Sequence, residues 1–64
     1  MVRINGKEVQ AAGMNLQAYL DQEGLRPERI AVELNGVIVK RGTYRTVTLC
    51  DGDTMEIVQF VGGG

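Results

Sequence analysis

The stretch that decides the fold is Asp51-Gly52-Asp53-Thr54-Met55-Glu56-Ile57-Val58-Gln59-Phe60, and Val61-Gly62-Gly63-Gly64 follows it at the end of the printed sequence. The Asp-Gly-Asp segment predicts a turn. The residues after it alternate between polar and apolar, which predicts a strand with one face in the core. Glycines have no Cβ, so the last residues can lie extended in a narrow channel, and we expect them to be mobile when free.

A carboxylate on Gly64 would be an anion at neutral pH and able to attack the α-phosphate of ATP. We therefore interpret the tail as a chemical handle that is held at the end of a rigid strand. The alternatives are a frayed terminus or a remnant of cloning. A start at Met1 without a tag favours the first interpretation.

Two Asn-Gly pairs precede this last strand and predict tight hairpin turns. Asn5-Gly6 is the strongest short signal, because a type I′ turn needs positive φ at both central residues. Asn35-Gly36 repeats the pattern later in the chain. Alternating apolar residues on both sides of each pair predict strands. The expected strands before the last one are residues 2–4, 7–10, 30–34 and 37–39.

One helix is predicted between the second and third strands. Asn15 is a good N-terminal cap, and Leu16, Tyr19 and Leu20 share one helical face. Gly24 supplies a left-handed stop. After the short strand at 37–39, residues 40–46 are interpreted as a polar loop.

This order of elements predicts an α+β protein with the ubiquitin-like β-grasp fold. We expect a mixed four- to five-stranded sheet, with one helix packed on one face and the first and last strands side by side in its centre. Residues 1–61 would form the domain, and residues 62–64 would form the flexible C-terminal tail.

Composition excludes several classes of site. The 64 residues contain one cysteine, Cys50, and no histidine, which rules out an internal disulfide, a zinc or iron–sulfur site and a histidine-dependent nucleophile. We therefore predict no metal site. Cys50 is either a reactive thiol or, as we favour, a small semi-apolar residue at a strand end. A lone cysteine fits a reducing cytoplasm.

Charge and hydropathy argue against nucleic acid and membranes as partners. The net charge of −1 gives no overall attraction to anionic polymers or surfaces. No apolar run approaches the about 20 residues that cross a bilayer. Lys40, Arg41 and Arg45 form a basic cluster, which we interpret as a solvated loop rather than a nucleic-acid site.

Strand alternation predicts a partner-binding face beside the tail. If Met55 and Ile57 face the helix, every second residue of the last strand faces away from it. An exposed valine and phenylalanine ringed by carboxylates would form a docking patch. The alternative is scattered surface apolar residues, which are normal. The expected partner-binding residues are Ala31, Glu33, Glu56, Val58, Phe60, Val61 and Gly62.

Two segments resemble the ThiS sulfur carriers of thiamine biosynthesis, a ubiquitin-like β-grasp family. They are Val32-Glu33-Leu34-Asn35-Gly36-Val37-Ile38-Val39-Lys40-Arg41 and the run from Leu49 to Gly64. The helix start and the Asn-Gly turns also match. Lys40 stands where this family often has proline, and Tyr44 stands where a tryptophan is common. These departures concern a loop and not the tail.

The resemblance implies a stoichiometric carrier that is not an enzyme and binds no cofactor itself. An E1-like adenylyltransferase of the ThiF type would bind Gly63-Gly64 beside ATP and magnesium, and the Gly64 carboxylate would become an acyl-adenylate. A persulfide donor such as a cysteine desulfurase would supply sulfur for a thiocarboxylate. That sulfur would pass to a thiazole synthase of the ThiG type.

Two other classes of function remain open from the residues alone. A ubiquitin-like protein modifier, or a carrier like the small subunit of molybdopterin synthase, would use the same tail for another acceptor. A β-grasp interaction module would have an inert tail. The sequence does not choose the acceptor, because every such protein offers the same carboxylate.

Overall fold

The computed structural model of this protein describes residues 1–60. The predicted tail at residues 62–64, the domain boundary at residue 61 and the expected site residues Val61, Gly62, Gly63 and Gly64 lie outside the described residues. The elements in chain order are β1 (Val2–Ile4), β2 (Lys7–Val9), α1 (Leu16–Gln22), the 3₁₀ helix η1 (Pro27–Arg29), β3 (Ile30–Leu34), β4 (Val37–Ile38), the 3₁₀ helix η2 (Arg41–Thr46) and β5 (Thr54–Gln59).

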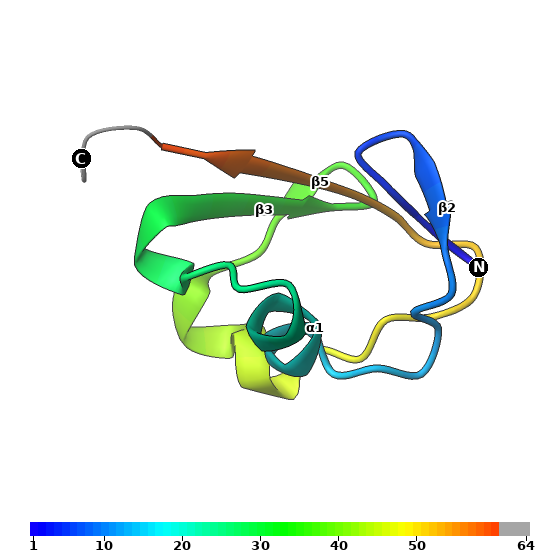
Figure 1. The fold of residues 1–64 in the computed structure, drawn as a ribbon, viewed down its shortest axis with the longest axis horizontal. Coiled ribbons are helices and arrows are strands. Elements are labelled where there is room, and N and C mark those ends of the chain that lie inside the picture. The colour runs from blue at the N-terminus through cyan, green and yellow to red at the C-terminus, as the bar shows by residue number, and fades with distance from the viewer. Residues whose placement is uncertain (61–64) are drawn as a thin grey trace.

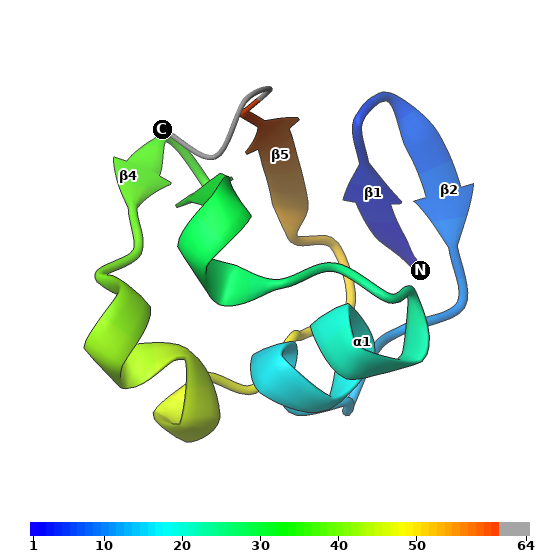
Figure 2. The same cartoon turned by 60° about the vertical axis from the view of Figure 1, so that its left-hand side comes forward.

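The strands form one mixed sheet with β5 in its centre. Their order is β2-β1-β5-β3-β4, with β1 and β5 parallel and the other pairs antiparallel. The helices lie on one side of this sheet, and the other side is left open (Figures 1 and 2). The predicted β-grasp fold is confirmed, with five strands.

Both Asn-Gly pairs adopt the predicted turn conformation. The φ angles are 49° at Asn5 and 82° at Gly6, and they are 52° at Asn35 and 83° at Gly36. Asparagine tolerates the left-handed region better than other non-glycine residues. Each pair therefore closes a hairpin, β1–β2 and β3–β4, and the two hairpins flank β5.

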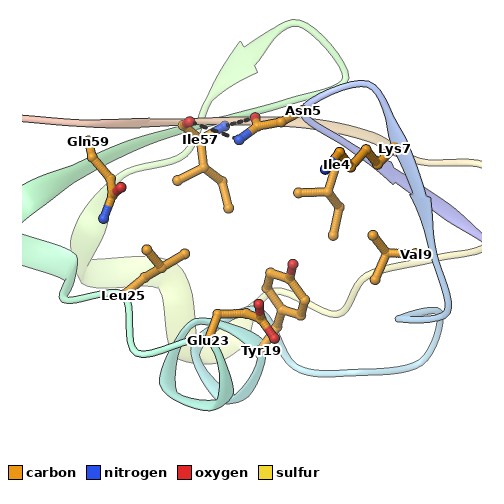
Figure 3. A pocket seen from close by; sticks show the side chains of 9 residues that line it. All are labelled: Ile4, Asn5, Lys7, Val9, Tyr19, Glu23, Leu25, Ile57 and Gln59. Carbon is orange, nitrogen blue, oxygen red and sulfur yellow. Dashed lines mark hydrogen bonds between the residues drawn. The ribbon is translucent and has the colours of Figure 1, made fainter.

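The two turn asparagines also hold β5 from its two sides. The amide oxygen of Asn5 accepts a hydrogen bond from the Ile57 N–H at 2.7 Å, and its amide nitrogen donates to the Ile57 carbonyl at 3.2 Å (Figure 3). On the opposite side, the amide oxygen of Asn35 accepts from the Thr54 N–H at 2.9 Å, and its amide nitrogen donates to Asp53 Oδ1 at 3.0 Å. The hairpin tips therefore fix both the start and the middle of β5.

Helix α1 begins and ends as its sequence predicts. The Asn15 side chain accepts a hydrogen bond from the Ala18 N–H at 3.1 Å, and its amide nitrogen donates to the Arg45 carbonyl at 2.7 Å. Gly24 has a φ of 71°, and the Leu25 N–H donates to the Leu20 carbonyl at 2.8 Å. This pattern is a Schellman closure.

The prediction of a polar loop at residues 40–46 is wrong for most of that segment. Residues 41–46 form η2, and Tyr44 is only 2% exposed there. Two threonine hydroxyls stabilise the turns, since Thr43 donates to the Lys40 carbonyl at 2.7 Å and Thr46 donates to the Thr43 carbonyl at 2.8 Å. The segment therefore contributes the aromatic ring of Tyr44 to the core, although cationic residues stand on both sides of Tyr44 in the sequence.

The core lies between the sheet and the helices. Its buried residues are Val2, Ile4, Ala11, Leu16, Tyr19, Leu20, Ile30, Val32, Tyr44, Leu49 and Met55. On β5, Met55 is fully buried as predicted, whereas Ile57 faces inward but is only partly buried. Ile57 lines an open hollow beside α1, so no helical side chain covers it completely.

The two hydrogen bonds between the Asn5 side chain and the Ile57 backbone predict a measurable loss of stability for Asn5→Ala. The variant loses two side-chain hydrogen bonds and places alanine in the left-handed region, which together should lower the free energy of unfolding by about 2–4 kcal/mol. Asn5→Gly is the matched control, because glycine keeps the positive φ and loses only the hydrogen bonds. Urea titrations of the three proteins should give the order wild type, glycine variant, alanine variant. Unchanged stability in both variants would contradict the conclusion that the Asn5 side chain stabilises β5.

The unequal burial of β5 predicts that Met55→Ala destabilises the domain more than Ile57→Ala. Truncation of a fully buried methionine typically costs about 2–5 kcal/mol. A half-covered isoleucine leaves no closed cavity, so its loss should be smaller. Thermal melting followed by circular dichroism compares the two variants. A larger effect at Ile57 would show that the hollow closes in solution.

Candidate functional site

The outer face of the sheet is defined by the register of three neighbouring strands. Ala31 of β3 lies opposite Val58 of β5, and Glu33 lies opposite Glu56. On its other side, Glu33 lies opposite Ile38 of β4. Because opposite residues share a face, these side chains lie together on the side that the helices leave open.

Large apolar side chains are exposed on this face and beside it. Val58 is 57% exposed and Phe60 is 45% exposed, as the alternation of β5 predicts. Ile38 is 65% exposed, and it was missed in the sequence analysis. Its signal was present, because a two-residue turn at Asn35-Gly36 pairs Ile38 with Glu33 and so places both on the outer face.

The outer face contains a shallow hollow of about 130 Å³ in its middle. Four of the residues that line it were expected from the sequence, and Ile38 is the fifth. The lining residues are Ala31, Glu33, Ile38, Glu56 and Val58. Apolar walls flank a pair of carboxylates, so this hollow suits an apolar group that carries a polar or cationic end.

Phe60 lies in an adjoining hollow and not in the central one. This second hollow has a volume of about 370 Å³, and its lining includes Lys40, Arg41 and Tyr44. Burial raises the pKa of Tyr44 more than the Arg41 cation lowers it, so the phenol stays neutral. The Phe60 N–H donates to the Arg29 carbonyl at 2.8 Å. This bond fixes the backbone at the last described residue.

The charged groups around the two hollows have no ion-pair partners within residues 1–60. The ion pairs in that part of the chain join the Met1 ammonium to Asp51, Arg3 to Glu8 and Arg26 to Glu28. None of them involves the acidic pair on β3 and β5 or the cations that follow β4. The described part of the chain therefore leaves these charges without an ion-pair partner.

A third hollow, of about 360 Å³, lies on the inner side between α1 and the sheet (Figure 3). The Tyr19 hydroxyl points into it, with Lys7 and Glu23 at its rim. Burial and the Glu23 carboxylate both raise the pKa of Tyr19, so this phenol is protonated at neutral pH. The Tyr19 phenol is therefore not activated as a nucleophile in this hollow.

The remaining candidate features are the thiol of Cys50, groups of metal ligands and membrane-spanning helices. Cys50 is an exposed free thiol, and its N–H donates to Asp53 Oδ2 at 2.8 Å across the turn before β5. Among residues 1–60, no three His, Cys, Asp or Glu side chains come together as metal ligands would. In the same part of the chain, no helix is long and apolar enough to span a membrane.

Comparison with known proteins places this architecture in a family. The family model described as "ThiS family" matches residues 2–64. The Bacillus subtilis protein named "Sulfur carrier protein ThiS" is 39% identical over 66 residues, which cover all of both chains. A thiazole synthase of Magnetococcus marinus is 44% identical over 64 residues, and one of Paramagnetospirillum magneticum is 44% identical over 62 residues. The chain spans only 20% and 19% of the lengths of these two synthases.

Solved structures agree with the sequence comparisons. The crystal structure of a thiamine biosynthesis protein (ThiS) from Geobacter metallireducens superimposes with a TM-score of 0.77 and 33% identity, over 98% of this chain and 97% of the other. A solution structure of a thiamine biosynthesis protein from the same organism gives a TM-score of 0.74 and 31% identity, over 98% of this chain and 86% of the other. Fold, length and sequence therefore agree, and this chain belongs to the ThiS family.

Proposed function

We propose that this protein is a sulfur carrier of thiamine biosynthesis that holds its sulfur as a thiocarboxylate on Gly64. The observation that carries the proposal is the extent of the family match, which runs from residue 2 through the terminal glycines to residue 64. The Bacillus subtilis sulfur carrier supports it, because that relative is covered over its whole length.

Activation begins at the Gly64 carboxylate. One carboxylate oxygen attacks the α-phosphorus of ATP on an E1-like adenylyltransferase, the bond between the α-phosphorus and the bridging oxygen to the β-phosphate breaks, and pyrophosphate leaves with magnesium. The resulting acyl-adenylate has an activated carbonyl carbon. The terminal sulfur of a protein persulfide attacks that carbon and AMP leaves. A thiol then reduces the acyl disulfide to the thiocarboxylate.

In this scheme the domain carries the reacting group and does not catalyse the reaction. ATP, magnesium and the persulfide belong to the partner enzymes in this scheme. The domain instead supplies a fixed origin for the tail. Four residues beyond Phe60 span at most about 14 Å when extended, so a partner must hold the domain within that distance of its reaction centre.

Thiazole synthase is the proposed sulfur acceptor. Two proteins named thiazole synthase contain a segment that resembles nearly the whole of this chain, as about a fifth of their length. Covalent linkage raises the effective concentration of two domains that must meet. The same pair, as separate chains, would require a docking surface, and the outer face beside Phe60 is the surface that we propose for it.

The proposed chemistry predicts that the last two glycines are essential. Deletion of Gly64, or Gly63→Val, should abolish ATP-dependent modification, because the carboxylate is displaced or a side chain blocks a channel shaped for bare backbone. Gly42→Ala is the control, because a Cβ there meets no atom within 4 Å. Intact-mass analysis after incubation with the adenylyltransferase and sulfur donor reads the exchange of one oxygen for sulfur. Normal exchange in either tail variant would rule the scheme out.

The exposure of Phe60 predicts a loss of binding without unfolding. Phe60→Ala should stay folded, since the ring is 45% exposed, and should bind the adenylyltransferase about 5- to 30-fold more weakly, as expected for loss of a docking anchor. Val37→Ala is the matched control, because Val37 is 67% exposed but lies opposite Leu34, away from the outer face. Calorimetric titration and thermal melting separate the two effects. Equal binding by both variants would remove Phe60 from the interface.

A further inference from the structure

The centre of the outer face contains an arrangement of charge that costs stability. Glu33 and Glu56 lie directly opposite each other in the antiparallel register of β3 and β5. Like charges in that position destabilise a sheet. Elsewhere on the sheet the rule is obeyed, since Arg3 lies opposite Glu8 and its Nε donates to the carboxylate at 2.9 Å. The acidic pair has no cation within 4 Å among residues 1–60.

A second unpaired charge of opposite sign lies at the neighbouring hollow. Lys40 and Arg41 line it together with Phe60, and neither cation has an acidic partner within residues 1–60. The two hollows adjoin, because Ala31 and Ile38 line both of them. The acidic apolar hollow of the outer face therefore adjoins a basic apolar hollow at the edge of the sheet. The lining of this second hollow also includes the core residues Ile30, Val32 and Tyr44, together with Phe60, which leads into the tail.

We propose that the two adjoining hollows form a docking surface with a built-in direction for thiazole synthase, two examples of which contain a segment that resembles this chain. The partner presents a cationic side chain to Glu33 and Glu56, an apolar side chain between the hollows, and an anionic side chain to Lys40 and Arg41. A partner rotated by about 180° around the normal to this surface would place like charges against each other, which complementary interfaces avoid. This inference rests on the proposed function, because direction matters only if the tail must enter a site on the partner.

The directional surface gives the acidic pair a role that the free domain does not. In the free domain the two carboxylates only repel each other, so neutralising one of them should improve the fold. In the complex the same carboxylates meet a cation and speed association. Stability and binding therefore respond in opposite directions to one substitution, which a purely structural role for the pair would not produce.

The first test uses Glu33→Gln, which removes the charge and keeps the size of the side chain. We expect the melting temperature to rise by about 1–5 °C. We also expect the association rate with thiazole synthase to fall about three- to tenfold at low salt, with a weaker dependence on salt. Glu23→Gln is the matched control, since Glu23 lies on the helical side and lines the inner hollow.

The second test addresses the basic end. Lys40→Gln combined with Arg41→Gln should slow association by a similar factor, and Lys7→Gln, at the rim of the inner hollow, should not. Stopped-flow fluorescence measures these rates. The proposal is overturned if the variants at the two hollows associate as fast as the controls, or if the wild type does not associate with thiazole synthase. Failure of the wild type to gain sulfur, with charge-dependent association intact, would instead overturn the proposed function alone.

Discussion

The structure depends on the hydrogen bonding of β5, the central strand of the sheet. β1 pairs with it on one side and β3 pairs with it on the other. The side chains of Asn5 and Asn35 extend this pairing at the two hairpin tips. A central strand held on both sides has few free backbone groups, so it gives the end of the domain a rigid base.

The position of β5 divides the protein into two surfaces with different roles. Its inward residues pack against α1 and η2, so the hydrophobic core lies on that side only. A single helix of seven residues leaves the other side of the sheet open. Within residues 1–60 no element covers the open side, and large apolar side chains such as Val58 are exposed on it.

A carrier needs little from its own domain beyond position and recognition. The proposed chemistry occurs on the tail and in the partners, and the domain sets where the tail begins and which way the domain faces its partner. The Phe60 N–H bond to Arg29 fixes the beginning. The unpaired charges on the outer face would fix the direction, at some cost to the stability of the free domain.

The sequence by itself determined the local structure. The Asn-Gly turns, the Asn15 cap, the alternation of β5 and the resemblance of residues 32–41 and 49–64 to a known family are all short-range signals. Only the tertiary structure decided that Tyr44 is buried and that Glu33 and Glu56 lie opposite each other. Those outcomes depend on which strands become neighbours, and residues as far apart as Asn5 and Ile57, 52 positions along the chain, meet only after folding. A local pattern sets the face on which a side chain lies, whereas cross-strand register sets what lies beside it.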